Sequence, residues 1–284
     1  RFTHFHRRFL FGSVADHLAE TFGTKGSPIS LSTACASGAS AIQLGVEAIR
    51  RGETDAALCV ATDGSVNAEA LIRFSLLSAL STRNDPPQKA SRPFSKGRDG
   101  FVMAEGAGAV VLESMESALA RGARPLGIVR GCGEMADDYH RTRSKPYGSA
   151  IIGAIRNALL DAGAAPEEID YVNAHGTSTP ENDKMEFLSL RAVLGDHLDV
   201  VPVSSTKSQI GHTLSAAGAI EAVLSLMMIA NGLILPTINY DEPDPEIPLD
   251  VVPNVPRRSP IRTVLSNSFG FGGQNAALVL SAAD

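Results

Sequence analysis

The sequence predicts an α/β fold with a mostly parallel sheet, on three observations. Short apolar runs typical of buried strands alternate along the chain with longer segments that carry apolar residues at helical spacing. Glycine, proline and Asn/Asp turns separate these segments. The residues that could carry chemistry follow the predicted strands, and in parallel α/β sheets functional sites lie beyond the carboxyl ends of the strands.

Composition bounds the class of protein. The 284 residues are 44% hydrophobic and 20% charged, so they can bury a core in one large or two modest domains. A formal net charge of -6 argues against nucleic-acid binding as the main activity, although a local basic patch could still meet an acidic partner. Three cysteines without framework spacing indicate a reducing compartment, and the cytoplasm is the simplest location.

No membrane association is expected. No signal-peptide pattern opens the chain, and the most apolar helical stretch, residues 216–230, is interrupted by Glu221 and is short for a bilayer. The chain starts without methionine, which suggests that a segment precedes it in the full protein. In the basic residues 1–8, His4 and His6 have no third ligand nearby, so we expect a solvated or interfacial segment there and no metal site.

The first elements lead to a cysteine. The pattern predicts a helix at residues 14–21, a strand at 28–31 and a helix at 39–51, with Cys35 at the turn between the last two. A sulfur at the start of a helix faces unpaired N–H groups and the positive end of the helix dipole, which favour the thiolate. A buried structural cysteine is the alternative at this stage, and Cys59 and Cys132 are expected to be strand residues.

The middle of the chain reads as strands separated by one helix and a long loop. Strands are predicted at 56–61, 110–112 and 126–129, a long polar loop at 81–100, and a helix capped by Ser114. Residues 68–80 form an apolar helical or irregular stretch that includes Phe74. This stretch could pack in the core or line a pocket for an apolar ligand, and the pattern does not separate the two.

The second half delivers two histidines. A helix at 149–163 precedes a strand at 169–173 that ends just before His175. The remaining elements, in order, are a helix at 181–194, a strand at 200–204 leading to Lys207 and His212, a helix at 214–231, irregular structure at 236–260, and strands at 264–267 and 276–280 joined by residues 268–275.

These segments predict one convergent site. Cys35, His175, His212 and the loop around Phe271 each follow a predicted strand, so four segments can meet in one crevice. A cysteine with one histidine is typical of thiol hydrolases and acyltransferases, whereas two histidines and a lysine indicate more than proton removal. The glycines of residues 270–273 leave backbone N–H groups open, as an oxyanion hole requires.

Five motifs in order resemble the β-ketoacyl-acyl-carrier-protein synthases, most closely the elongating synthase II type of the thiolase superfamily. They are Thr33-Ala34-Cys35-Ala36-Ser37-Gly38, residues 79–85 with 98–101, His175-Gly176-Thr177-Ser178-Thr179-Pro180 with Asp183, Lys207-Ser208 with Gly211-His212, and Asn267-Ser268-Phe269-Gly270-Phe271-Gly272-Gly273. The resemblance extends over nearly the whole chain.

The resemblance implies a thiolase-like fold, layered αβαβα with two pseudo-repeated halves. Residues 1–122 would be the remainder of the N-terminal half, which carries the nucleophilic cysteine. Residues 123–284 would be the C-terminal half, which carries both histidines and the glycine-rich loop. A front section on the order of a hundred residues, the N-terminal part of the first half, would be absent from this chain.

The resemblance also implies a decarboxylative Claisen condensation in fatty acid biosynthesis. Cys35 would take the acyl group from a carrier-protein thioester, with the N–H groups of Cys35 and Phe271 holding the oxyanion. His175 and His212 would bind the carbonyl of the malonyl-carrier-protein thioester, and Lys207 would set their electrostatics. The supporting and substrate-binding residues implied are Asp183, Glu186 and Glu221 around Lys207, Thr177 and Thr179 on the pantetheine arm, Phe271 as gate, and Phe74 and Phe269 along the acyl pocket.

The expected partners are acyl- and malonyl-loaded carrier protein and a second copy of the chain in a homodimer, with no metal or dissociable cofactor. Ser215, Gln274 and the pair Glu181-Asn182 depart from the commonest family pattern around the pocket. These departures leave the acyl chain open and admit a polyketide-type ketosynthase. A non-catalytic partner subunit of the chain-length-factor kind would lack the cysteine, and a plain cysteine hydrolase would leave the second histidine and Lys207 without a role.

Overall fold

The computed structural model describes residue 10 and residues 12–283. His4 and His6, for which no metal site was predicted, lie outside the described residues. Within the described part of the chain, no group of three or more His, Cys, Asp and Glu side chains is placed to hold a metal ion.

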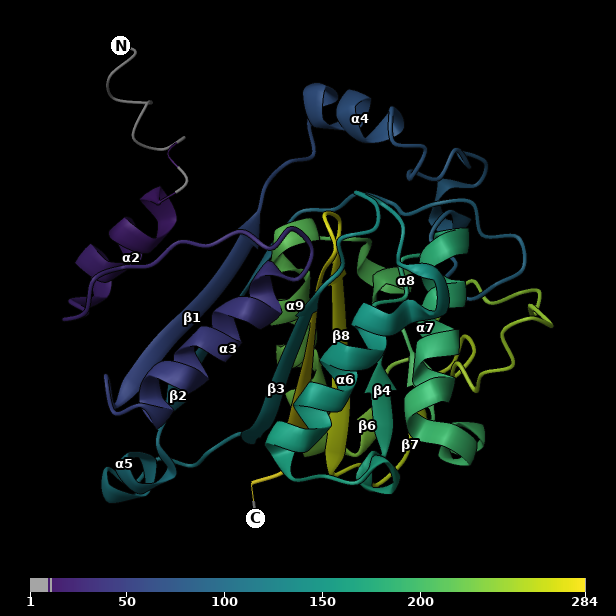
Figure 1. Ribbon diagram of the computed structural model, residues 1–284. Helices are drawn as coiled ribbons and strands as arrows, with labels where there is room; N and C mark the ends of the chain where they lie inside the picture. Colours follow the sequence, from purple (N-terminus) through teal and green to yellow (C-terminus); the bar gives the residue numbers. More distant parts are fainter. Residues whose placement is uncertain (1–9, 11, 284) are drawn as a thin grey trace, which may run out of the picture.

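The predicted helices occur in the predicted order, and a short helix that was not predicted, α8, begins at Lys207 (Figure 1). Ser114 caps its helix as expected, accepting a hydrogen bond from Ser117 N–H at 3.2 Å, and Asn67 caps the preceding one. Residues 68–80 thus begin as a helix and end in irregular structure. The helices are α2 (Ser13–Phe22), α3 (Ser37–Arg50), α4 (Ala68–Ser75), α5 (Met115–Ala120), α6 (Ser149–Ala162), α7 (Pro180–Leu194), α8 (Lys207–Ile210) and α9 (Ala217–Asn231).

The strands form one five-stranded sheet and two small ones. The large sheet has the order β3-β9-β8-β4-β5, β1 pairs with β2, and β6 pairs with β7. The strands are β1 (Ala56–Asp63), β2 (Gly106–Glu113), β3 (Ile128–Ala136), β4 (Tyr171–Asn173), β5 (Val203–Ser204), β6 (Leu233–Ile234), β7 (Arg257–Arg258), β8 (Thr263–Gly270) and β9 (Gln274–Ser281). As predicted, Cys59 and Cys132 are strand residues.

The prediction of a mostly parallel sheet is wrong. β4 runs parallel to β5 and β8, but β9 is antiparallel to both of its neighbours, and β1 is antiparallel to β2. The reason for β8 and β9 is that only residues 271–273 join them, and a short turn between adjacent strands forces a hairpin. The sheet is therefore mixed.

The predicted strand at residues 28–31 is also absent. The segment is irregular up to an isolated bridge at Thr33, and the side chain of Ile29 is 73% exposed. An alternating pattern forms a strand only where a neighbouring strand satisfies its backbone groups. None of the described strands pairs with this segment.

The fold is layered, as the predicted thiolase-like fold requires. Helices α6 and α7 cover one face of the large sheet, α3 and α9 pack on its other face, and β1 and β2 cover those two helices (Figure 1). β8 and β9 are buried along almost their whole length, whereas β1 and β2 are half-exposed. The described residues thus supply four layers, and the division of the chain at residue 123 stays a prediction.

Two helix-strand-strand units, α3-β1-β2 and α9-β8-β9, repeat across the molecule. A side chain on Gly38 of α3 would collide with the backbone N of Ala219, and one on Gly218 of α9 would meet the backbone N of Ala39 at 2.6 Å. The two contacts are reciprocal, as a local two-fold relation between α3 and α9 demands. The small residues let the helix N-termini cross closely, which brings Cys35 toward the α9 side.

Residues 214–231, which include α9, are long and apolar enough to span a membrane by length and composition alone. Half of the segment is buried inside the molecule, and α9 packs against β2, β8 and α3. Glu221 within it is 1% exposed and paired. These contacts are those of the core helix of a globular protein.

Candidate active site

Cys35 sits two residues before α3, held by its neighbours' backbone. Ala34 has a positive φ of 48°, and the Ser37 hydroxyl donates to Ala34 O at 2.6 Å and accepts from Thr33 N–H at 3.0 Å. Across the site, a Cβ on Gly270 would lie 2.5 Å from Thr33 O, so only glycine lets the β8–β9 hairpin approach this turn. The side chain of Cys35 is buried at 8% exposure.

The thiol does not have the lowered pKa that the helix start led us to expect. Burial raises the pKa of Cys35 to about 11. The N–H groups of Phe271 and of Cys35 itself and the charge of Lys207 lower this pKa, but the effect of burial is larger. Cys35 lies one residue before the N-cap of α3, and the full helix dipole acts only within the first turn. The two N–H groups at the sulfur are nevertheless those predicted for an oxyanion hole.

His212 approaches the sulfur directly. Its Nε2 lies 3.2 Å from Cys35 Sγ, and Leu214 N–H donates to its Nδ1 at 3.3 Å. Its backbone is clamped between Val102 O at 2.7 Å and Ala104 N–H at 3.0 Å. Burial and the charge of Lys207 lower the pKa of His212 well below 6.5. The ring is therefore neutral, and with Nδ1 accepting, Nε2 carries the proton that points at the sulfur.

His175 is held in the same tautomer by a different partner. Lys207 Nζ lies 3.4 Å from His175 Nδ1 and also pairs with the carboxylate of Glu221. Because an ammonium can only donate, His175 Nδ1 accepts and Nε2 carries the proton. Burial, followed by the charge of Lys207, lowers the pKa of His175 well below 6.5. The rings of His175 and His212 meet edge to face with centroids 5.4 Å apart.

Of the three carboxylates expected around Lys207, only Glu221 contacts it. Glu186 accepts from the backbone N–H groups of His175 and Gly176, both at 2.8 Å, and burial raises its pKa to about 7. Asp183 accepts from Phe94 N–H at 2.8 Å and from Ser178 N–H at 3.2 Å. Both carboxylates thus hold the backbone of the turn that carries His175. They can reach it because α7 begins directly after this turn, and Asp183 and Glu186 are buried residues in its first half.

The two threonines border the same turn. Thr177 and Thr179 share a hydrogen bond between their hydroxyls at 2.9 Å, and the Thr179 hydroxyl also accepts from Asn182 N–H as the N-cap of α7. Thr177 is buried and Thr179 half-buried. Contact of either with a pantetheine arm stays a prediction.

An aromatic chain backs the histidines. The ring centroids of Phe74 and Phe101 lie 5.6 Å apart, and those of Phe101 and His212 lie 5.2 Å apart. On the other side, the ring centroids of Phe269 and His175 lie 5.5 Å apart. Phe271 joins the same apolar cluster as Phe74 and Phe101. Phe101 is not among the site residues predicted from the sequence, although it closes the Arg98-Asp99-Gly100-Phe101 motif.

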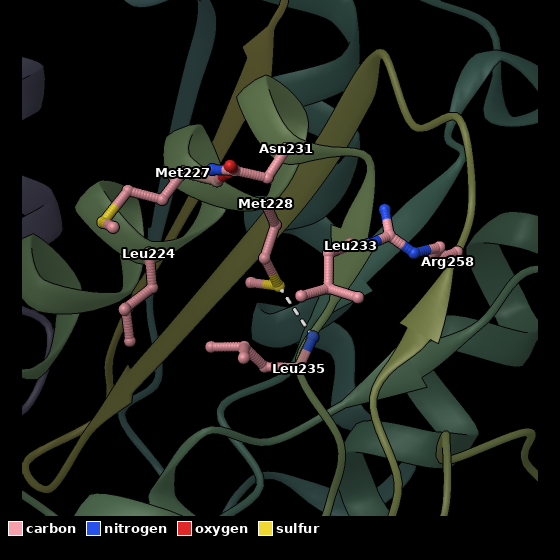
Figure 2. Close-up of a pocket in the computed structure, with 7 residues that line it drawn as sticks. All are labelled: Leu224, Met227, Met228, Asn231, Leu233, Leu235 and Arg258. Atoms are coloured by element: carbon pink, nitrogen blue, oxygen red, sulfur yellow. Dashed lines mark hydrogen bonds between the residues drawn. The ribbon is translucent and has the colours of Figure 1, made fainter.

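A shallow apolar pocket of about 240 Å³ lies elsewhere, where the end of α9 meets β6 and β7 (Figure 2). It contains none of the predicted site residues, and its one charged side chain is Arg258. Two of the lining residues are joined by a hydrogen bond from Leu235 N–H to Met228 Sδ at 3.2 Å. The predicted catalytic residues lie around Cys35 and not in this pocket.

The fold and site define a protein of the thiolase-like class, in which a buried cysteine lies against the Nε2 of one neutral imidazole, His212, and the ring of His212 meets that of a second, His175. Residues 9–118 match the protein family described as "Beta-ketoacyl synthase, N-terminal domain", and residues 126–241 match the family described as "Beta-ketoacyl synthase, C-terminal domain". The chain belongs to the β-ketoacyl synthase family.

Curated relatives include a 3-oxoacyl-[acyl-carrier-protein] synthase and a polyketide synthase subunit. The chain is 46% identical over 260 residues to 3-oxoacyl-[acyl-carrier-protein] synthase 2 of Coxiella burnetii, covering 92% of this chain and 63% of that protein. It is 42% identical over 273 residues to the tetracenomycin polyketide synthase ketoacyl synthase alpha subunit of Streptomyces glaucescens, covering 96% and 64%. The chain thus spans somewhat less than two thirds of these relatives.

Solved structures agree on the fold. A type II polyketide synthase complex, AntDE:AntF, in which an acyl-carrier protein is bound to its ketosynthase, matches with a TM-score of 0.96 at 39% identity, covering 98% of this chain and 69% of that chain. The ishigamide ketosynthase/chain length factor matches with a TM-score of 0.91 at 39% identity, covering 98% and 67%. The thiolase-like ketosynthase fold is therefore confirmed.

Proposed function

We propose that the protein catalyses the decarboxylative Claisen condensation of an acyl group with malonyl-acyl-carrier protein to give 3-oxoacyl-acyl-carrier protein. The observation that carries this proposal is the meeting of Cys35, His212 and His175 in one buried cluster, with His212 Nε2 3.2 Å from Cys35 Sγ. A hydrolase needs one imidazole as base, whereas two neutral N–H donors suit the binding of an enolate oxygen.

In the first half-reaction, the Cys35 sulfur attacks the thioester carbonyl of the acyl-carrier protein. The new S–C bond forms as the carrier's C–S bond breaks, and the thiol proton ends on the carrier thiol. The N–H groups of Cys35 and Phe271 bind the oxyanion of the tetrahedral intermediate. Since burial keeps the thiol protonated in the free protein, we expect the proton to leave as the carrier thiolate departs.

In the second half-reaction, malonyl-carrier protein binds with its thioester oxygen between the Nε2–H groups of His175 and His212. Loss of carbon dioxide leaves the electron pair of the broken C–C bond in an enolate, whose oxygen the two donors stabilise. The enolate carbon attacks the Cys35 thioester, a C–C bond forms, and the Cys35 thiolate leaves and takes up a proton. Lys207 keeps His175 Nδ1 occupied, so that Nε2 remains a donor.

The acyl chain is assigned to fatty acid elongation, with a polyketide chain as the alternative. The 46% identity to a 3-oxoacyl-carrier-protein synthase supports the first, and the 42% identity to a tetracenomycin subunit favours keeping the second. The presence of Cys35 speaks against a non-catalytic partner subunit. Carrier protein as partner and a homodimer remain part of the proposal.

The test is the intact mass of the full-length protein after incubation with a series of acyl-carrier proteins, with Cys35→Ala as control. We expect a gain of one acyl group in the wild type and none in the variant, and release of 3-oxoacyl-carrier protein when the malonyl form is added. The acyl group that loads best separates saturated fatty chains from polyketide intermediates. No mass gain with any donor would contradict the proposal.

A further inference from the structure

Asp63 is a half-buried carboxylate at the end of β1 that the proposed mechanism does not use. Its Oδ2 accepts from Ser215 N–H at 3.2 Å, and its Oδ1 accepts from Ser65 N–H at 3.1 Å. The first of these bonds joins β1 to Leu214–Ala216, a single 3₁₀ turn directly before α9, which we call the Leu214 turn. Asp63 thus ties this turn to a strand that lies 152 positions away in the sequence.

The Leu214 turn needs a partner of this kind. Leu214 has a positive φ of 49°, a strained conformation for a leucine that persists only where the surroundings hold it. N–H groups in the first turn of a helix have no acceptor within the helix, and Ser215 N–H is one of them. Gly106, which pairs with Asp63 across the strands, leaves room for the turn, because a side chain there would lie 3.3 Å from Thr213 Cγ2. Asp63 therefore supplies an acceptor that the turn itself lacks.

The Leu214 turn also sets the tautomer of His212. Leu214 N–H donates to His212 Nδ1 at 3.3 Å, and the next N–H along the chain, that of Ser215, is the one that Asp63 holds. A bond of this length is long for an N–H donor, so a small movement of the turn is enough to lose it. With Nδ1 unoccupied, a neutral imidazole can carry its proton on either nitrogen. The Nε2 proton that faces Cys35 therefore depends on the position of the turn.

The charge of Asp63 also reaches the nucleophile. Burial is the largest influence on the pKa of the Cys35 thiol and raises it. The charge of Lys207 lowers this pKa, and the charge of Asp63 raises it. The two charges act on the sulfur from different elements, α8 and β1. Asp63 is thus part of the electrostatic surroundings of the site as well as an anchor of the turn beside it.

We propose that Asp63 is a positioning residue, which holds the Leu214 turn so that His212 keeps its proton on Nε2. The proposal rests on the proposed function, because that function needs the Nε2–H group as a donor to the enolate oxygen. If the anchor is lost, the Nδ1–H tautomer becomes populated and Nε2 presents a lone pair to the enolate oxygen. Decarboxylation of the malonyl thioester should then slow, whereas attack of Cys35 on the acyl thioester, which uses no donor at Nε2, should not.

The first test reads the tautomer directly, in the full-length protein labelled with nitrogen-15 in its histidine rings. The chemical shifts of the two ring nitrogens show which one is protonated, and a His212→Asn sample assigns the signals. We expect a single Nε2–H tautomer in the wild type and a mixture in Asp63→Ala. Asp170→Ala is the matched control, because Asp170 is also half-buried and also accepts from two backbone N–H groups, those of Arg262 and Thr263. It directly precedes β4, whereas His175 lies beyond the other end of that strand.

The second test measures the two half-reactions separately. For Asp63→Ala we expect release of carbon dioxide from malonyl-carrier protein by the acylated protein to fall about tenfold, since losing an oxyanion donor outright costs about a hundredfold or more and a mixture of tautomers keeps part of it. Acylation of Cys35, followed by intact mass, should stay unchanged, as should both half-reactions of Asp170→Ala. Asp63→Asn offers one acceptor for two N–H groups, so it should show the same changes to a smaller extent, and it replaces Asp63→Ala if that variant does not fold.

Two outcomes would overturn the positioning role. One is a single Nε2–H tautomer of His212 in the Asp63 variants. The other is an equal loss in both half-reactions, which would assign Asp63 to the fold alone. If the wild type is acylated by no donor, the proposed function fails, but the tautomer of His212 is still measured and decides by itself whether Asp63 positions the ring.

Discussion

At the scale of single residues, the site depends on which ring nitrogen carries each proton. Leu214 N–H occupies Nδ1 of His212 and Lys207 occupies Nδ1 of His175, so both neutral rings direct an Nε2 proton into the site. The low pKa of each ring, caused first by burial, keeps both rings as single donors at neutral pH. A backbone N–H at His212 and a lysine at His175 thus give both rings the same tautomer, with the proton on Nε2.

Glu186 is the buried carboxylate that fixes the backbone of the turn carrying His175. Its two oxygens accept from the backbone of His175 and Gly176, and Asn267 Nδ2 donates to it at 3.1 Å. In Glu186→Gln one oxygen becomes an NH₂ group that faces another donor. We expect a loss of about 2 kcal/mol in the free energy of unfolding, the typical effect of leaving a buried donor unpaired.

This loss is best measured by denaturant unfolding at pH 8, above the pKa of about 7, where Glu186 is ionised. Glu167→Gln changes an exposed residue and serves as the control. Equal midpoints for the two variants would show that the carboxylate is not needed to hold the His175 turn.

At the scale of elements, the crossing of α3 and α9 sets the position of the nucleophile. Gly38 contacts the backbone of Ala219, and a methyl group there cannot be accommodated without moving one helix. We expect Gly38→Ala to lower the free energy of unfolding by about 2 kcal/mol, as overpacking does, and to slow acylation because Cys35 moves with α3.

The measurement for this prediction is the denaturant midpoint together with the acylation rate. Gly26→Ala is the matched control, because nothing lies within 4 Å of the added methyl group. A Gly38→Ala protein as stable and as active as the Gly26→Ala protein would mean that the helices can separate freely.

At the scale of the whole molecule, burial of ionisable groups couples stability to pH. The pKa values of His175 and His212 lie well below 6.5 in the folded protein, and an unfolded histidine titrates near 6.5. Below pH 6.5 the unfolded chain therefore binds protons that the folded protein does not, and the free energy of unfolding falls as the pH falls. Each ring contributes a slope of up to about 1.4 kcal/mol per pH unit.

We expect a His175→Asn/His212→Asn variant to lose less stability than the wild type between pH 6.5 and 5. Glu186 acts in the opposite direction, since its raised pKa makes the folded state bind the extra proton between about 4.5 and 7. That contribution is common to both proteins, so the difference between their unfolding curves isolates the imidazoles. Parallel pH profiles would mean that the rings titrate normally in the folded protein.

Much of the site followed from local pattern. The helices around Cys35 and His175 were predicted within a few residues, because apolar periodicity, caps and glycine stops are properties of neighbouring residues. Phe101 was missed as a site residue, because its only signal was membership of a motif. Its contact with His212 joins residues more than a hundred positions apart.

The sequence by itself determined the residue types of the site and the turns that carry them, since these are local. Only the tertiary structure decided the strand directions, the missing strand at residues 28–31 and the raised pKa of Cys35. It also decided that Asp183 and Glu186 serve the His175 turn while Glu221 alone serves Lys207. Strand pairing, burial and ion pairing depend on partners far along the chain, and no local pattern names those partners.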